Sequence, residues 1–171
     1  YNDATSYLTS LSYNSLQLFS NSDALKLDFL ATSSATTVGE LRQEITDAIN
    51  NDELAKIDAP YYKYMAHIDR DFPERNFPTE VELTLKLGAK VMFIANDLAQ
   101  PRRYYNGKIG EITEINNDEI WVTCDGESEA IKVSLEVWEN KSYTIDPKTN
   151  QLEEKTLGTF TQYPLRLAWA I

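Results

Sequence analysis

The feature that most constrains this chain is a series of closely spaced turn signals after residue 105. The signals are Asn106-Gly107, Asn116-Asn117-Asp118 and Asp125-Gly126. They separate runs rich in β-branched and apolar residues, which predicts strands at 108–115, 119–124 and 129–135. Strands this short and close form an antiparallel meander that curls into a small barrel. We therefore expect a barrel of about five short strands over 106–138, with no helix between 108 and 124. Its expected core residues are Ile112, Ile120, Val122 and Val133.

The preceding residues divide into a helical end and a connection to the barrel. Thr37 and Glu40 form a capping box, and apolar residues at helical spacing follow, which predicts a helix over 38–50. Residues 21–30 fit a helix or a strand, and 31–37 fit a loop. After Pro60 the pattern is mainly β. Alternating residues at 81–87 predict a half-buried strand, and 91–95 is apolar on both faces, as in a central strand. The fold class is therefore α+β.

Composition excludes several functions. The chain has 171 residues, 42% of them hydrophobic, and a formal net charge of −11, which excludes a polybasic DNA-binding protein. The longest apolar runs are about a quarter of the roughly 20 residues that a membrane-spanning helix needs, so we expect no membrane association. One cysteine and no leader sequence make the cytoplasm the expected location. The chain begins at Tyr1 without methionine and ends at Ile171 in an apolar stretch, so we expect a fragment of a longer protein.

No motif for catalysis or metal binding is present. Gly107-Lys108 lacks both the earlier glycine and the following hydroxyl residue of a phosphate-binding loop. One histidine and one cysteine cannot build the usual zinc site, and the acidic residues lack the spacing of a calcium loop, so we expect no bound metal. His67 is interpreted as a structural or surface residue and Cys124 as a small buried hydrophobe. The many carboxylates are interpreted as a solvated surface.

One segment runs against the acidic balance. Residues 86–110 carry a net charge of +4, from Lys86, Lys90, Arg102, Arg103, Lys108 and the single acid Asp97. Within it, residues 102–108 combine three cations with two tyrosines, the combination found on surfaces that bind single-stranded nucleic acid. The alternative is that the tyrosines cover one end of the barrel while the arginines pair with nearby glutamates.

Four ordered stretches resemble the C-terminal half of superfamily 1 DNA helicases of the Pif/RecD type. The stretches are Asp71-Phe-Pro-Glu-Arg-Asn-Phe-Pro-Thr-Glu, Leu85-Lys-Leu-Gly-Ala-Lys-Val-Met-Phe-Ile-Ala-Asn-Asp, Arg103-Tyr-Tyr-Asn-Gly-Lys-Ile-Gly-Glu-Ile and Gly158-Thr-Phe-Thr-Gln-Tyr-Pro-Leu-Arg-Leu-Ala-Trp-Ala-Ile. The resemblance covers roughly residues 64–171. It implies that 61–105 contains a connector and strands of the second RecA-like motor domain and 106–157 an inserted Src-homology-3-like barrel, after which 158–171 returns to the motor domain. Residues 1–60 would be a helical segment of unknown role.

The resemblance also implies a function. The parent would be an ATP-dependent DNA helicase that moves along single-stranded DNA, using ATP and magnesium held elsewhere, because this fragment lacks the ATPase motifs and holds no cofactor. Its partners would be single-stranded DNA and the remaining motor domains, and its role DNA repair, DNA recombination or mobile-element transfer. The residues expected near DNA are Arg102, Arg103, Tyr104, Tyr105 and Lys108, and those expected to form the turn are Asn106, Gly107 and Gly110. The alternative function is a protein-interaction barrel without nucleic-acid contact.

Overall fold

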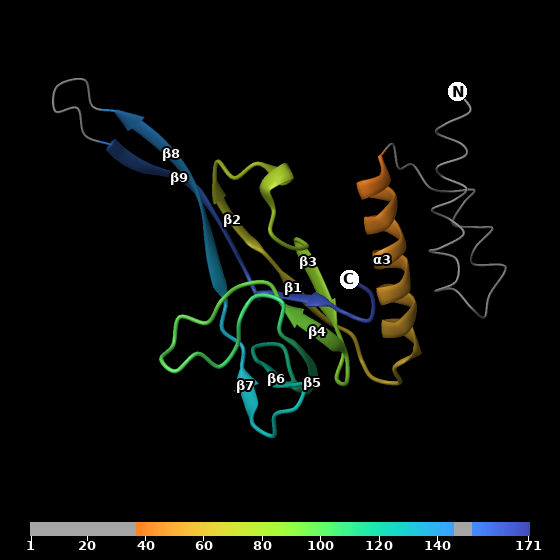
Figure 1. Cartoon of the computed structure of the whole chain (residues 1–171). Helices are drawn as coiled ribbons and strands as arrows, with labels where there is room; N and C mark the ends of the chain where they lie inside the picture. The colour runs from red at the N-terminus through yellow and green to blue at the C-terminus, as the bar shows by residue number, and fades with distance from the viewer. Residues whose placement is uncertain (1–36, 146–151) are drawn as a thin grey trace, which may run out of the picture. The chain divides into compact units, whose positions relative to one another are not determined.

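The computed structural model describes residues 37–145 and 152–171, which belong to two compact units (Figure 1). The first unit is described over 37–52 and 170–171, and the second lies within 53–169. The open choice at 21–30 and most of the loop expected at 31–37 lie outside the described residues. Among these residues, no helix combines the length and the apolar character needed to cross a bilayer.

Helix α3 spans Val38–Lys56 and confirms the helix expected from 38, while extending six residues beyond the expected end. Its capping box is formed. The Thr37 backbone N–H donates to Glu40 Oε2 at 3.1 Å, and the Glu40 N–H donates to Thr37 Oγ1 at 3.2 Å. In the first unit the buried Asn50 side chain donates to the Ala170 carbonyl and accepts from the Ala170 N–H, at 3.1 and 2.9 Å.

An antiparallel five-stranded sheet forms the centre of the second unit, in the order β10-β4-β5-β6-β7. Its strands are β4 (Lys90–Phe93), β5 (Ile109–Ile115), β6 (Ile120–Cys124), β7 (Ala130–Lys132) and β10 (Leu165–Leu167). The strands predicted at 108–115 and 119–124 are confirmed, and the third is shorter than predicted. The interval 108–124 contains no helix, as expected.

The barrel prediction is corrected in one respect. The described residues form no closed barrel, and 106–138 contributes β5, β6, β7 and only the start of β8. The five-stranded sheet is completed by β4 and β10, which come from sequence on either side of that interval. The four expected core residues are nevertheless almost completely buried, because their alternation puts them on the covered face. They are Ile112, Ile120, Val122 and Val133.

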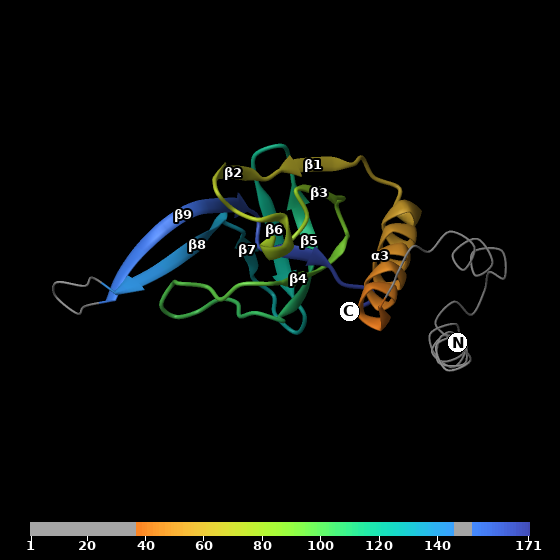
Figure 2. The same cartoon turned by 90° about the horizontal axis from the view of Figure 1, so that it is seen from above.

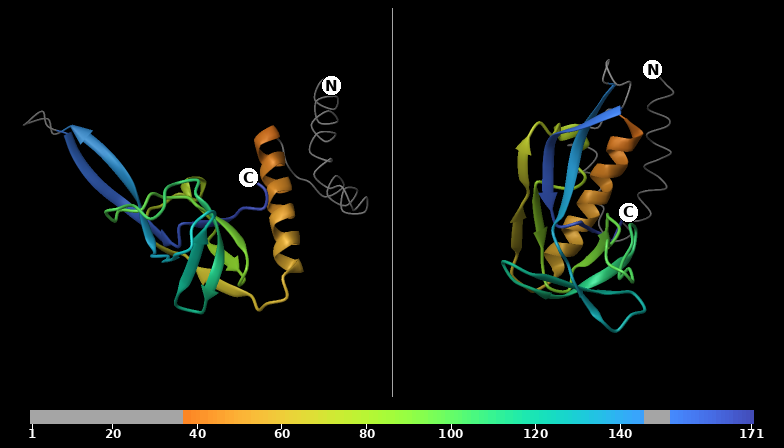
Figure 3. Two further views of the ribbon diagram at one scale, coloured as in Figure 1. Left: turned by 60° about the horizontal axis from the view of Figure 1, so that its bottom comes forward. Right: turned by 90° about the vertical axis from the view of Figure 1, so that its left-hand side faces the viewer.

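Two smaller antiparallel sheets complete the second unit. Strand β1 (Tyr62–Met65) pairs with β3 (Glu82–Leu85), where the alternating strand was expected. A three-stranded sheet has the order β2-β9-β8. Its strands are β2 (His67–Arg70), β8 (Glu136–Ile145) and β9 (Leu152–Gln162), and a short 3-10 turn, η1 (Glu74–Asn76), follows β2. The paired strands β8 and β9 project as a ribbon beyond the five-stranded sheet in Figures 1 and 2 and in the left-hand view of Figure 3.

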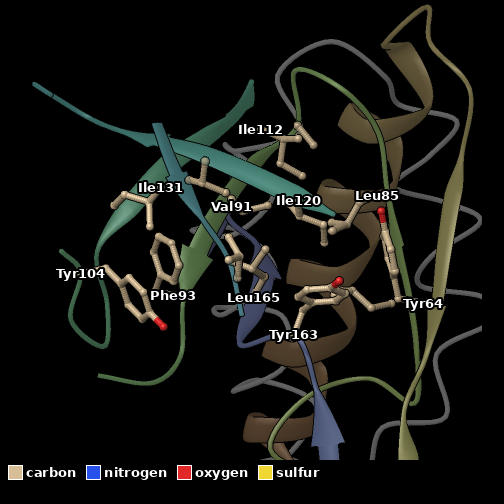
Figure 4. Packing of buried hydrophobic residues seen from close by; sticks show 14 of the residues in the cluster. Tyr64, Leu85, Val91, Phe93, Tyr104, Ile112, Ile120, Ile131, Tyr163 and Leu165 are labelled. Carbon is tan, nitrogen blue, oxygen red and sulfur yellow. The ribbon is translucent and has the colours of Figure 1, made fainter. Parts of the chain in front are cut away.

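The core of the second unit lies between these sheets. Strand β4 lies between β5 and β10, as expected for a central strand. Only one of its faces is completely buried: Val91 and Phe93 are inaccessible, whereas Met92 between them is partly exposed, so the expected burial of both faces is wrong. Leu85 from β3 and Leu165 from β10 are also completely buried. Figure 4 shows them together, with Tyr64 and Tyr163 at one end and Tyr104 beside Phe93 at the other.

Candidate nucleic-acid loop

Residues 94–108 form the loop that connects β4 to β5, and they include the three cations and two tyrosines of 102–108. The expected turn at Asn106-Gly107 is present: the Lys108 N–H donates to the Tyr105 carbonyl at 3.0 Å, and Gly107 has a φ of 94°. The turn is not of type I′, the usual type for an Asn-Gly hairpin, because that type requires positive φ at both central residues and Asn106 does not have it. A single positive φ at the third position is typical of a type II turn.

Asp97 holds this loop together from inside. The residue is only 4% exposed, and its carboxylate accepts hydrogen bonds from the backbone N–H groups of Ala99 and Arg103, at 3.0 and 3.1 Å. The Arg103 guanidinium adds two parallel hydrogen bonds, from Nε at 2.6 Å and from Nη2 at 3.1 Å. These bonds from Arg103 lower the pKa of the Asp97 carboxyl far below its usual value. Asp97 thus neutralises Arg103 and fixes the backbone on both sides of Pro101.

The two adjacent tyrosines point in opposite directions. Tyr104 is 4% exposed, and its ring stacks on Phe93 with centroids 4.0 Å apart and planes 13° from parallel (Figure 4). Burial raises the pKa of its hydroxyl. Tyr105 is 58% exposed. Only the second ring is therefore accessible to a base.

Lys108 also has protein partners. Its ammonium forms an ion pair with Glu127 and donates to the Arg103 carbonyl at 2.9 Å, and the Glu127 carboxylate raises the Lys108 pKa. The Asn106 N–H donates to Asn96 Oδ1 at 3.0 Å. These contacts secure the end of the loop where β5 begins.

Gly110 lies in β5 rather than in the turn. A Cβ there would approach the Thr123 carbonyl oxygen to 2.6 Å and Val122 Cγ1 to 2.7 Å, so glycine is needed for the close pairing of β5 with β6.

The exposed side chains of the loop include Arg102, Tyr105 and Leu98, which is 86% exposed. Arg103 is exposed as well, but its charge is paired with Asp97. Outside the loop, Lys86 is buried: its ammonium donates to the Ile57 carbonyl at 2.7 Å and lies 4.0 Å from the centroid of the Tyr61 ring. Lys90 is partly exposed on β4. Most of the positive charge of residues 86–110 is therefore paired or buried within the protein, and Arg102 carries the exposed, unpaired charge of the described loop.

Sequence reasoning missed the residues that attach the β5–β6 turn. The Tyr64 hydroxyl donates to the Asn116 carbonyl, and the Tyr163 hydroxyl donates to the Asp118 carbonyl at 2.9 Å. The two rings meet edge to face with centroids 5.0 Å apart, and burial raises both hydroxyl pKa values. Buried Gln162 donates to the Tyr64 carbonyl at 2.8 Å, which fixes β1 to the end of β9. The sequence likewise shows Asp97 only as the single acid in a basic segment.

The remaining single residues behave as expected. Cys124 is buried, which raises its thiol pKa, and His67 is exposed on β2. In the part of the chain that the structure describes, no three histidine, cysteine or carboxylate side chains gather as a metal site would require.

Solved structures of Pif1 helicases are similar to this chain. Unliganded Pif1 from a Bacteroides species is 35% identical with a TM-score of 0.65, and the match covers 73% of this chain and 28% of that one. Bacteroides Pif1 bound to ssDNA is 35% identical, with a TM-score of 0.63 and the same coverage. This chain is a Pif1-like superfamily 1 helicase region. Pif1 from Candida albicans, 23% identical with a TM-score of 0.57, covers 75% of this chain and 34% of its own and shares the fold.

This Pif1-like region spans about 28% of the length of the Bacteroides helicase that it matches. No protein-family model matches it. Among curated proteins there is likewise no match.

Proposed function

We propose that this region belongs to an ATP-dependent DNA helicase that moves along single-stranded DNA, and that the loop at 94–108 contacts the strand. The main support is the 35% identity to a Bacteroides Pif1 whose structure contains ssDNA. A loop that is held from inside and exposes a cation beside an aromatic ring has the groups that single-strand binding requires. In the parent, ATP and magnesium would bind outside this region.

The five residues expected near DNA divide into two roles in this proposal. Arg102 binds a phosphate, since no described residue neutralises it, and Tyr105 stacks on a base. Arg103, Tyr104 and Lys108 keep the loop in shape through Asp97, Phe93 and Glu127. The number of phosphate contacts sets how steeply the logarithm of the binding constant falls with the logarithm of the salt concentration. Three contacts would give a slope of roughly −2, whereas one contact gives about −0.7.

Fluorescence anisotropy of a labelled oligothymidine tests the proposal. We expect weak binding, best at low salt, because residues 111–157 carry a net charge of −8. Arg102→Ala should weaken binding by roughly fivefold and flatten the salt dependence. Tyr105→Ala should weaken it by about tenfold, and Tyr105→Phe should not, because stacking needs only the ring.

Arg75→Ala is the matched control, because Arg75 is an exposed arginine in η1, away from the loop. If Arg102→Ala and Tyr105→Ala bind oligothymidine as well as the wild type, the loop has a structural role only. A protein-interaction function for this region would then replace the DNA contact.

A further inference from the structure

Strand β8 forms an open edge of the three-stranded sheet. Within the described residues it pairs with β9 alone, over Glu136–Ile145. Its other side therefore presents a row of backbone N–H and C=O groups ten residues long. An exposed edge of this length is a template for pairing with another strand.

One face of β8 carries three exposed apolar side chains. Residues with odd numbers share this face, because side chains alternate along a strand. Val137, Tyr143 and Ile145 on it are each more than half exposed, as is Leu135 just before the strand. Between them lie Glu139 and Lys141, whose charged groups are 3.1 Å apart, and Lys141 also forms an ion pair with Glu154 of β9.

This order of residues is complementary to itself. In an antiparallel pair, two directly opposed residues either both point their N–H and C=O groups at the partner strand or both point them away from it, and the two kinds of pair alternate along the strands. When β8 pairs with a copy of itself, odd residues therefore oppose odd residues, and one residue lies opposite its own copy. Centring the pair on Glu139 or on Lys141 would put two like charges face to face, which is unfavourable.

Centring the pair on Asn140 removes every such conflict. Glu139 then lies opposite Lys141 of the second copy, and Val137 lies opposite Tyr143. Leu135 lies beside Ile145 of the copy. Opposite charges and apolar pairs in these positions each stabilise antiparallel strands.

We propose that two copies of this chain associate through their β8 strands, antiparallel and centred on Asn140, to join two three-stranded sheets into one of six strands. The symmetry is twofold, so each contact away from the central Asn140 pair occurs twice. The described ribbon residues carry four glutamates and two lysines, a composition that disfavours a nucleic acid as the occupant.

Cysteine cross-linking of the full chain tests the register. Asn140→Cys should give a disulfide-linked dimer under mild oxidation, since directly opposed Cβ atoms lie about 5 Å apart. Ser142→Cys is the matched control on the same face of β8. Its own copy would lie about 13 Å away along the strand, so it should not cross-link. Cys124 is buried and remains unreacted. Equal cross-linking of both variants, or none with folded Asn140→Cys, would overturn the register.

Sedimentation tests the association itself. We expect the wild-type chain to change from monomer to dimer at tens of micromolar. Glu139→Lys, which places lysine opposite Lys141, should weaken the dimer at least tenfold. Glu153→Lys makes the same charge change on β9, on the other face of the ribbon, and should leave the dimer intact. A wild-type chain that stays monomeric throughout, or a Glu139→Lys dimer as tight as the wild type, refutes the proposal.

Discussion

At the scale of single residues, Asp97 decides the shape of the candidate loop. Four hydrogen bonds reach its carboxylate, two from backbone N–H groups and two from the Arg103 guanidinium. A carboxylate buried among such donors is stable only while they all remain in place. The exposed position of Arg102 and Tyr105 therefore depends on a residue that need not touch DNA.

Asp97→Asn should lower the free energy of unfolding by about 2–4 kcal/mol at neutral pH, because it removes the charge while keeping the size of the side chain. The pKa of Asp97 is lower in the folded chain than in the unfolded chain. Its contribution to stability is thus fully present above about pH 4 and declines as the pH falls. Urea unfolding at about pH 7 and pH 3 should show a smaller difference between variant and wild type at the lower pH. A difference that does not change with pH would contradict this role.

The sequence shows which residues crowd the loop but not which of them face inward. Tyr104 and Tyr105 are chemically identical, and the difference between them comes from Phe93, eleven positions before Tyr104. Arg103 differs from Arg102 only because Asp97 lies within its reach. These contacts depend on how a long connection folds back, which no local pattern records.

At the scale of secondary-structure elements, the β8–β9 ribbon is attached at an irregularity in its pairing. Asn140 pairs with Gly158 and Lys141 with Thr156, which leaves Leu157 as an extra residue. At this point the Asn140 side chain donates to the Asp71 carbonyl at 2.8 Å. A Cβ on Gly158 would collide with that same carbonyl and lie 2.7 Å from the Asp69 oxygen.

Gly158→Ala should therefore lower the free energy of unfolding by about 1–3 kcal/mol, because backbone atoms of the neighbouring strand must shift. Gly39→Ala is the control: a Cβ there meets nothing closer than 4.0 Å, and alanine favours the helix, so stability should rise by up to about 1 kcal/mol. Thermal unfolding of both variants checks the contrast. Equal stability for the Gly158 variant would show that the close approach is relaxed in solution.

The sequence predicts elements well where one face is buried and poorly where it is not. The capping box locates the start of α3, and alternating apolar residues locate β3, β5 and β6. The ribbon lacks alternating apolar residues, since most of β8 and residues 152–155 of β9 are exposed. It forms because each strand supplies the other's hydrogen bonds.

At the scale of the whole molecule, the question is what this Pif1-like region does when separated from the rest of a helicase. We expect it to bind no Mg-ATP and to hydrolyse none, because its sequence contains no phosphate-binding loop. Calorimetric titration with Mg-ATP should give no heat of binding. Micromolar affinity would contradict this expectation.

The position of β10 beside β4 also affects how the chain folds during its synthesis. Leu165 pairs with Phe93, 72 residues earlier in the sequence. On the ribosome, β5, β6 and β7 emerge soon after β4 and pair with near neighbours, but β4 has no partner on its other side until residues 165–167 have been made. Contacts between such distant residues form slowly, and uncovered strands favour aggregation meanwhile. Completion of the five-stranded sheet is therefore a late event, and one side of β4 stays unpaired until β10 has been made.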